Sequence, residues 1–339
     1  MLEVLNISSS TRKSLTIMTI MTAETGKEFA PISRDCWFLT GPTASGKSSI
    51  AIELAKRLDA EIVSLDSMAL YRGMDIGTAK PTAEQQQQVV HHMIDVVEPT
   101  ESYSLAEYLT AVHDLVEQIH ERQHSALFVG GTPLYLKSLL RGLYSGPEAD
   151  WEFREQVQQE LEERGADALH ARLAQIDPLS AHKLHPNDTK RVIRALEVYR
   201  ATGEPISHQQ VHFDDTESQP HSRAFVLAWD RSELHQRIER RVDEMFEKGL
   251  VAEVDSLLTT HGELSRTAMQ AVGYREVIDH ITGGHSIEET VEKVKARTRQ
   301  FARRQVTWFR RLDECQLINR SDSDSLGELL NHITAAESQ

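Results

Sequence analysis

The sequence predicts an α/β protein, with a parallel sheet covered by helices on both faces and an inserted all-helical domain. In the first 144 residues, short apolar strands alternate with amphipathic helices, an order that builds parallel sheets. From residue 145 to 202 the strand pattern disappears and only helical spacing remains. A chain of 339 residues is long enough for one sizeable core and a second, smaller domain.

The predicted elements follow from the spacing of apolar residues and from turn residues. The strands are expected at 36–41, 61–65, 126–129 and 224–229, and the helices at 47–58, 105–120, 151–173, 187–201 and from Pro133. Proline favours the first position of a helix. Parallel sheets bind ligands at the carboxyl ends of their strands. We therefore expect 41–48, Asp66-Ser67 and Gly131-Thr132 to line one crevice.

These elements divide the chain into five segments. The predicted segments are a disordered extension at 1–34, an α/β core at 35–144, a helical insertion at 145–202, a polar loop at 203–223, and the rest of the core with a basic C-terminal helix at 224–339. The insertion is expected to bind a partner. The core is expected to bind a phosphate compound.

A phosphate-binding motif, GPTASGKS, stands between the first strand and the first helix. Strand, glycine loop and helix in this order are the context that gives the motif its meaning. The residues predicted to hold phosphate are Gly41, Pro42, Thr43, Ala44, Ser45, Gly46, Lys47 and Ser48. Backbone N–H groups and the helix N-terminus attract the anion, Lys47 adds a charge, and the Ser48 hydroxyl is a ligand for Mg²⁺. The fold class is therefore a P-loop NTPase-like core.

The amino-acid composition indicates the cellular compartment that the protein occupies. Two cysteines far apart, Cys36 and Cys315, indicate neither a disulfide framework nor a metal site, which favours the cytoplasm. No apolar run approaches the roughly 20 residues of a membrane span, so no membrane association is expected. Nothing in the sequence requires more than a monomer.

The net charge of −15 argues against a nucleic-acid partner, but the charges are unevenly distributed. Between Lys293 and Arg311 there are eight basic residues and no acidic one. Such a stripe can neutralise phosphates locally. The alternative is a solvated helix face whose charges meet acidic neighbours.

Three further positions have competing interpretations. Asp66 is a general base, a magnesium ligand or the cap of a turn. Thr132 presents its hydroxyl to the crevice or caps the helix that begins at Pro133. His91-His92 has metal-ligand chemistry, but neighbouring residues of a strand point to opposite faces, so a metal site is not expected.

Six blocks of sequence together resemble the tRNA dimethylallyltransferases. The blocks are GPTASGKS, DSMALYRGMDIGTAKP at 66–81, VGGTPLYLKSLLRGL at 129–143, HPNDTKRVIRALEVY at 185–199, AVGYRE at 271–276 and TRQFARRQVTWFRR at 298–311. Six blocks in order are far more specific than a phosphate loop alone. The C-terminal zinc finger of many eukaryotic members is absent from the chain, which resembles the bacterial form.

The resemblance implies transfer of a dimethylallyl group from dimethylallyl diphosphate to N6 of the adenine 3′ of the anticodon, with Mg²⁺ as cofactor. Asp66 corresponds to the carboxylate that accepts the N6 proton, Thr132 to a threonine of the reaction channel, and Arg241 to an arginine at the diphosphate; Arg237 lies one turn away and is an alternative. Because a stacked adenine cannot reach a buried carboxylate, we expect the base to be extruded.

The same correspondence implies contacts with the tRNA anticodon stem-loop. The implied residues are Asp66, Ser67, Met68, Ala69, Thr132, Arg154, Lys190, Arg191, Val192, Ile193, Arg194, Gln270, Ala271, Val272, Gly273, Tyr274, Arg275, Arg303, Arg304, Gln305, Val306, Thr307, Trp308, Phe309 and Arg310. Trp308 and Phe309 also fit a buried helix face, since aromatic residues at helical intervals are more often core.

Two other function classes share parts of the pattern. A small-molecule or nucleoside kinase has the phosphate loop and a carboxylate at a strand end, but it needs ATP. An RNA-binding nucleotide switch has no covalent chemistry and would not depend on Asp66 for catalysis.

Overall fold

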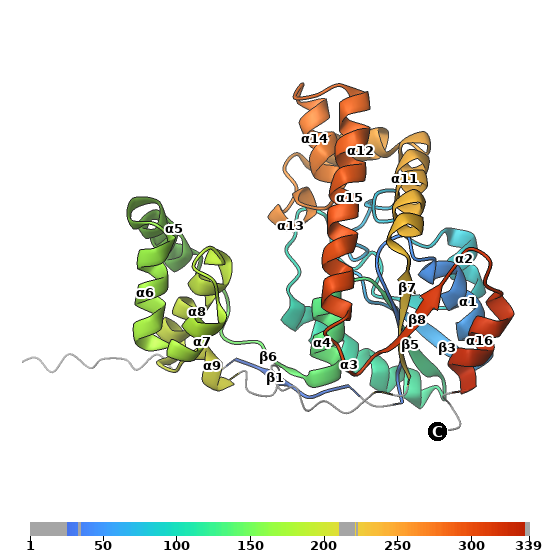
Figure 1. Ribbon diagram of the computed structural model, residues 1–339, viewed down its shortest axis with the longest axis horizontal. Coiled ribbons are helices and arrows are strands. Elements are labelled where there is room, and N and C mark those ends of the chain that lie inside the picture. The colour runs from blue at the N-terminus through green and yellow to red at the C-terminus, as the bar shows by residue number, and fades with distance from the viewer. Residues whose placement is uncertain (1–25, 33–34, 210–220, 222, 336–339) are drawn as a thin grey trace, which may run out of the picture. The chain divides into compact units, whose positions relative to one another are not determined.

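The structure, a computed structural model, describes residues 26–32, 35–209, 221 and 223–335 (Figure 1). The described chain forms two compact units. The smaller unit is made chiefly of Gly146–Ile206, and the larger unit combines Lys27–Ser145 with Ser207–Gln339. The insertion was expected at 145–202, and this part of the smaller unit spans Gly146–Ile206.

The larger unit is built on a six-stranded sheet. Its strands are β2 (Trp37–Thr40), β3 (Ala60–Ser64), β4 (His91–His92), β5 (Ser125–Gly130), β7 (Ala224–Trp229) and β8 (Gln316–Arg320). They lie in the order β4-β3-β5-β2-β7-β8, and every neighbouring pair is parallel. The predicted fold class is confirmed. The phosphate loop, Gly41–Ser48, leaves the central strand β2.

Both faces of the sheet are covered. The covering helices are α1 (Lys47–Leu58) and α16 (Leu326–Thr334) on one face and α3 (Leu105–Glu121) and α4 (Pro133–Arg141) on the other. Successive residues of a strand point to opposite faces, so Phe38 of β2 packs in the core with α3 and α4. Its neighbours Trp37 and Leu39 pack with α1 and α16.

A second layer of helices stands beyond the carboxyl ends of the strands (Figure 1). Its members are α11 (Arg231–Glu247), α12 (Leu250–His261), α13 (Arg266–Met269), α14 (Tyr274–Ile281) and α15 (Ile287–Phe309). Helices α11 and α15 pack along each other, and Ile238 of α11 and Ala302 of α15 are buried in the same hydrophobic cluster. The short helix α2 (Ala83–Gln88) precedes β4. Helices α11 to α15 place charged side chains beyond the carboxyl ends of the strands, which is where a parallel sheet binds ligands.

In its described residues the smaller unit contains helices and no strand. They are α5 (Trp151–Arg164), α6 (Ala166–Ile176), α7 (Pro178–Lys183) and α8 (Thr189–Thr202). The stretch predicted as helical at 151–173 is two helices, because Gly165 interrupts it with φ 83° and ψ 167°. Apolar residues such as Phe153, Leu173 and Leu196 form its core.

Two boundary predictions are wrong in part. The extension predicted at 1–34 includes β1 (Glu28–Phe29), which pairs antiparallel with β6 (Leu143–Tyr144), and Phe29 and Ile32 are buried in the core of the larger unit. The loop predicted at 203–223 includes the helical turn α9 (Ile206–Gln209). Both elements are too short to show a hydrophobic period. Residues 1–25, 33–34, 210–220 and 222 lie outside the described residues.

Across the described ranges, none of the helices has both the length and the apolar character needed to cross a membrane. The cysteines Cys36 and Cys315 are both free thiols.

Candidate active site

The phosphate loop turns directly from β2 into α1. Gly46 occupies the N-cap position of α1 with φ 86°, a left-handed value that glycine adopts without strain. Lys47 folds back over the loop and donates hydrogen bonds to the carbonyls of Gly41 and Pro42, at 2.9 and 2.7 Å, and to the Ser45 hydroxyl at 3.2 Å. An ammonium group and a helix N-terminus therefore meet in one loop, an arrangement that suits a phosphate anion.

Gln305, a buried residue of α15, joins the phosphate loop to the neighbouring strand end. Its Oε1 accepts a hydrogen bond from the Thr43 N–H at 2.9 Å, and its Nε2 donates to the Gly131 carbonyl at 2.5 Å. Only 4% of the residue is exposed. A single side chain thus fixes the distance between the loop after β2 and the loop after β5.

The end of β3 meets the end of β5 through hydrogen bonds. The Thr132 hydroxyl oxygen accepts a hydrogen bond from the Ser67 N–H at 3.1 Å, and the Thr132 N–H donates to the Leu65 carbonyl at 3.1 Å. Thr132 is the N-cap residue of α4, but its side chain makes no capping hydrogen bond there. Hydrogen bonds therefore join the three strand ends that were expected to line one crevice.

Asp66 has one oxygen engaged and one available. Oδ1 accepts a hydrogen bond from the Met68 N–H at 2.9 Å, which is the turn cap considered from the sequence. The second carboxylate oxygen has no hydrogen bond to any part of the chain that the structure describes. The cap and an active carboxylate are therefore compatible within one residue, because each uses a different oxygen.

The charges of the crevice influence one another. The pKa of Lys47 is lowered to about 7, chiefly by burial and also by the nearby Arg241 guanidinium, while Asp66 opposes the shift. Burial also lowers the pKa of Arg241, against the attraction of Asp66. Two cations and one carboxylate thus share a poorly solvated space. The cations lack enough nearby negative charge, so an anion entering this space is stabilised.

Arg237 and Arg241, one turn apart on α11, have different partners. Arg237 donates through Nε to the Ala44 carbonyl at 2.9 Å and pairs with Asp322 at 2.7 Å. Among the described residues, Arg241 has a single long hydrogen bond, of 3.5 Å to the Thr78 carbonyl. Arg237 is therefore a support of the phosphate loop. Arg241 is the one of the two that lies beside the crevice charges with its donors largely unused.

Ser48, the second residue of α1, is exposed, so its hydroxyl can reach a metal ion. In the described ranges no group of three or more histidine, cysteine, aspartate and glutamate side chains is placed to hold a metal. Mg²⁺ commonly binds through one or two protein oxygens together with the phosphates of a substrate. The donor set therefore fits Mg²⁺ bound with a diphosphate, with Ser48 as the protein ligand.

Comparison with known proteins identifies the family. The family model described as IPP transferase matches residues 69–312. The tRNA dimethylallyltransferase of Rhodopirellula baltica is 50% identical over 309 residues, which cover 89% of this chain and 92% of that protein. The enzyme of the same name from Acetivibrio thermocellus is 42% identical over 299 residues, covering 87% and 95%. The chain belongs to the tRNA dimethylallyltransferase family.

Solved structures agree with this assignment. The full-length tRNA isopentenylpyrophosphate transferase from Bacillus halodurans superposes with a TM-score of 0.65 at 38% identity, covering 89% of this chain and 96% of that one. A eukaryotic dimethylallyltransferase captured acting on tRNA superposes with a TM-score of 0.69 at 28% identity, covering 85% and 74%. The family assignment thus rests on both sequence and fold.

In this family member, the segment at 270–275, which the resemblance implied as a tRNA contact, is partly interior. Tyr274 is fully buried, and its hydroxyl donates to Glu253 at 2.6 Å. Glu253 also accepts hydrogen bonds from the backbone of the loop at 75–77, including the Ile76 N–H at 2.7 Å. A side chain at Gly77 would collide with the Tyr274 ring. Gln270 and Arg275 are exposed.

The helical unit of this family member holds its arginines on a buried carboxylate. Glu197 is 1% exposed and accepts hydrogen bonds from Arg154, at 2.8 and 2.9 Å, and from Arg194. Lys190 and Arg191 are exposed, whereas two residues of the implied tRNA contacts are buried in the core of this unit. Those two residues are Val192 and Ile193.

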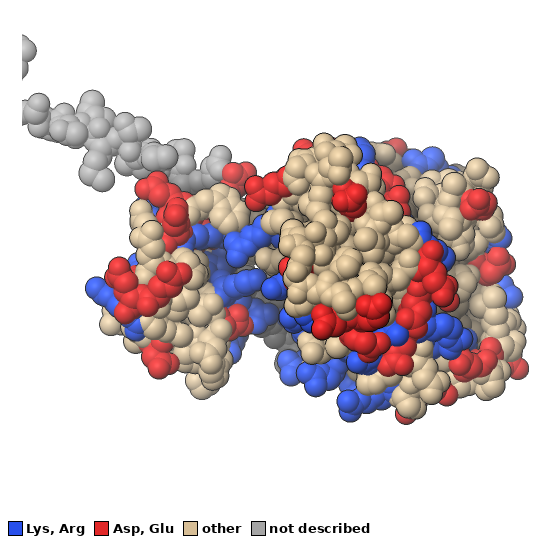
Figure 2. Space-filling view, turned by 90° about the horizontal axis from the view of Figure 1, so that it is seen from above, with Lys and Arg blue, Asp and Glu red and all other residues tan. Residues whose placement is uncertain are grey.

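The basic stripe on α15 has two halves with different surroundings. In the first half, Lys295 pairs with Asp243 at 2.8 Å and Arg299 with Glu239 at 2.8 Å, as expected for a solvated helix face. In the second half, within the described chain, the exposed side chains of Arg303, Arg304 and Arg310 form no ion pair. Figure 2 shows basic and acidic side chains gathered in separate patches on one face of the larger unit.

Two interactions escaped prediction from the sequence. The Glu253 carboxylate and the loop it binds are 176 to 178 residues apart, and Gln305 is 262 residues from Thr43. No spacing rule links residues so distant. Gln305 was expected among the tRNA contacts, but its side chain lies between the two loops of the crevice and is buried.

Proposed function

We propose that this protein transfers the dimethylallyl group of dimethylallyl diphosphate to N6 of the adenine 3′-adjacent to the anticodon of tRNA, releasing diphosphate. The observation that carries the proposal is the Asp66 carboxylate, which has one oxygen available beside Lys47, Arg241 and Thr132. A kinase can also place a carboxylate opposite its phosphate loop, so the requirement for ATP separates that class from the proposed one. An attacking amine that must lose a proton needs such a base.

The proposed reaction accounts for every bond, proton and electron pair with groups in the crevice. The allylic carbon–oxygen bond of dimethylallyl diphosphate breaks, and a bond forms between that carbon and adenine N6. The N6 proton passes to the available Asp66 oxygen, and the electron pair of the broken bond leaves with the diphosphate. Lys47, Arg241 and the loop N–H groups stabilise that charge, and Thr132 lines the path between base and leaving group. Mg²⁺ held by Ser48 would add Lewis-acid stabilisation of the diphosphate.

RNA recognition divides between contacting and supporting residues. We assign direct contact to the more exposed members of the implied set, since buried side chains cannot reach a macromolecule. The contacting members are Arg154, Lys190, Arg191, Arg194, Gln270, Arg275, Arg303, Arg304, Thr307 and Arg310. The buried members, such as Tyr274 and Gln305, hold the contacting ones or the phosphate loop in place.

The target adenine has to leave its stack to meet Asp66. Enzymes that act on a base extrude it, and the cost is least in single-stranded loops. Unpaired loop bases are also where proteins read RNA sequence. An adenine of the anticodon loop can therefore be extruded at low cost into a crevice that contains a carboxylate. We place the enzyme in the cytoplasm as a monomer, in line with its free cysteines.

The test is a transfer assay with radiolabelled dimethylallyl diphosphate, Mg²⁺ and an anticodon stem-loop, without ATP. We expect labelled RNA that yields N6-dimethylallyladenosine on digestion. An otherwise identical stem-loop with guanine at the target position is the control and should stay unlabelled. Product that forms only with ATP, carrying phosphate in place of the prenyl group, would establish a kinase.

A further inference from the structure

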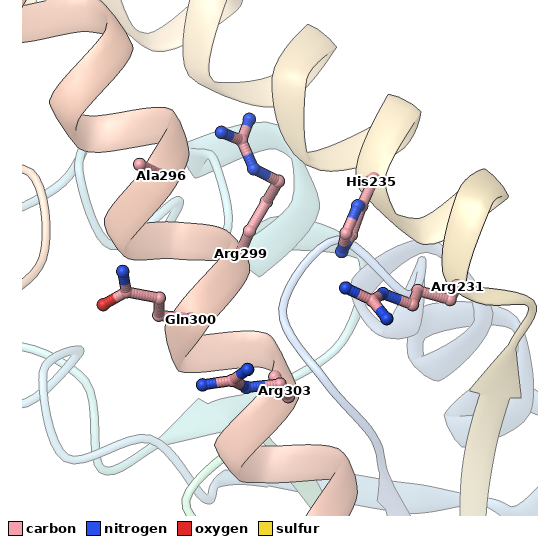
Figure 3. A pocket seen from close by; sticks show the side chains of 6 residues that line it. All are labelled: Arg231, His235, Ala296, Arg299, Gln300 and Arg303. Carbon is pink, nitrogen blue, oxygen red and sulfur yellow. The ribbon is translucent and has the colours of Figure 1, made fainter.

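A cavity of about 210 Å³ lies between α11 and α15, apart from the reaction crevice. Its lining residues are Arg231, His235, Ala296, Arg299, Gln300 and Arg303. Figure 3 shows Arg231 and His235 extending from α11 towards α15, which carries the other four residues. We call this the α11–α15 cavity. Both helices belong to the larger unit.

The α11–α15 cavity is strongly basic and poorly neutralised. No acidic residue is among its lining side chains. Arg299 pairs with Glu239, whereas Arg231, His235 and Arg303 have no hydrogen-bond or ion-pair partner for their side chains within the described ranges. Like charges around one space repel one another and attract an anion. This charge pattern points to an anionic ligand.

The cavity is distinct from the diphosphate site. On α11 the phosphate loop is bound by Arg237, and on α15 it is bound by Gln305. At 3.6 residues per turn, Arg237 lies roughly 160° around the helix from His235, and Gln305 lies roughly 160° from Arg303. The same two helices therefore present one face to the diphosphate loop and another to the cavity.

We propose that the α11–α15 cavity binds a phosphate group of the RNA backbone, outside the reaction crevice. Three of its members, Arg231, Gln300 and Arg303, are exposed, as contact with a macromolecule requires. Pockets for small-molecule ligands instead enclose most of the ligand surface. The Gln300 amide can both donate and accept a hydrogen bond, which matches the 2′-hydroxyl next to each RNA phosphate. The inference rests on the proposed function, because it requires an RNA substrate.

The cavity lengthens the RNA-binding surface of α15. The contacts implied by resemblance begin at Arg303 and end at Arg310. Adding the cavity extends this surface back to Ala296, so the phosphate-binding part of the helix spans about 21 Å at 1.5 Å per residue. Such a length accommodates several successive phosphates of one strand and gives the enzyme a hold on the stem as well as on the loop.

The test compares Arg231→Glu with Arg240→Glu. Arg231 is the first residue of α11, where an acidic side chain favours the helix dipole, so lost binding cannot be ascribed to a weakened helix. Arg240 is an exposed arginine on the opposite side of the same helix and gives the same change in charge. The measurement is the dissociation constant of the full-length tRNA, taken at several salt concentrations.

We expect Arg231→Glu to weaken tRNA binding about tenfold and to reduce the salt slope by about one, the value of one phosphate contact. The KM for dimethylallyl diphosphate and kcat at saturating tRNA should not change. Binding equal to that of the unaltered protein, or an equal loss in Arg240→Glu, overturns the proposal.

Inorganic phosphate serves as the second probe, by titration calorimetry. If phosphate binding requires Arg231 while tRNA affinity does not, the cavity holds a free anion and the RNA assignment is wrong. Failure of the proposed function is separate: the unaltered protein would then bind tRNA and transfer no dimethylallyl group to it.

Discussion

At the residue scale, Asp66 can combine two roles, because its two carboxylate oxygens have different surroundings. Oδ1 holds the turn through the Met68 N–H, and the other oxygen faces no donor of the described chain. A residue that only capped the turn would be replaceable by asparagine, which has the same acceptor oxygen. A residue that also accepts a proton would not be replaceable. The two roles can therefore be separated by one substitution.

We expect Asp66→Asn to fold normally and bind tRNA with unchanged affinity, because the acceptor for Met68 N–H remains. The rate of dimethylallyl transfer should fall about 10²–10⁴-fold, the usual contribution of a positioned base. Single-turnover assays and equilibrium binding measure the two quantities. Asp75→Asn, at an exposed carboxylate paired with Lys80, is the control and should retain its rate. A near-normal rate in Asp66→Asn would remove Asp66 from the reaction.

The lowered pKa of Lys47 gives diphosphate binding a pH dependence. Because the pKa is about 7, the ammonium form predominates below pH 7 and is lost above it. Binding of a diphosphate favours the ammonium, so at pH 7 the protein should take up roughly half a proton. Calorimetry in buffers of different ionisation enthalpy measures this uptake.

The same experiment with Lys47→Arg provides the correction for ionisation of the diphosphate itself, because arginine stays charged throughout. Above pH 7, the affinity of the unaltered protein should fall relative to that of Lys47→Arg. Parallel pH profiles for the two proteins would contradict the assigned pKa.

At the element scale, α15 carries residues assigned above to both proposed substrates. Its exposed side carries Arg303 and Arg304, and its buried side sends Gln305 to the phosphate loop and to Gly131. The resemblance alone implied one function for the whole segment. The geometry divides it into two faces, since residues 303 and 305 lie on different sides of a helix.

Gln305→Met preserves the size of the side chain and removes both hydrogen bonds. We expect the KM for dimethylallyl diphosphate to rise at least tenfold, because the Thr43 N–H and the Gly131 carbonyl lose their partner. The affinity for tRNA should stay within twofold. Thr307→Ala, an exposed change on the same helix, should leave the diphosphate KM unaltered. Loss of tRNA affinity with an unchanged KM would restore Gln305 to the RNA contacts.

The elements also show what the sequence could predict. The helix at Lys47–Leu58 and the strand at Ala224–Trp229 match their predicted bounds, since both have strong apolar patterns that end at clear boundary residues. The edge strand Gln316–Arg320 was missed because its residues are partly exposed and polar. The proximity of the three strand ends was anticipated from the order of the elements. The contacts of Glu253 and Gln305 were not, because they join residues more than 170 positions apart.

At the scale of the whole molecule, the net charge of −15 is a poor guide to the partner. The acidic side chains neutralise the first half of the stripe on α15 and leave the second half unpaired. Local cations set RNA affinity, while distant charges are screened beyond about 8 Å at physiological salt.

We expect the double variant Arg303→Glu, Arg304→Glu to weaken tRNA binding at least 100-fold and to lower the salt slope by about two or more. The matched control is Arg240→Glu with Lys248→Glu, which makes the same change in net charge on exposed residues of α11 and the position after it. The slopes come from dissociation constants measured between 50 and 200 mM salt, a range in which about six to ten phosphate contacts give large changes. Equal effects in both variants would show a general charge effect only.

In the sheet, the central strand β2 lies between β5 and β7. In the sequence, residues 146–206 of the helical unit stand between these two strands. On the ribosome, β2 and β5 emerge long before β7, which follows more than 90 residues after the end of β5. Domains tend to fold as their residues are completed, from the N-terminal side first. The helical unit has all of its helices once residue 202 has emerged, when the sheet still lacks two strands. The smaller unit can therefore fold on the nascent chain first, and the catalytic crevice is completed only after α15 has left the exit tunnel.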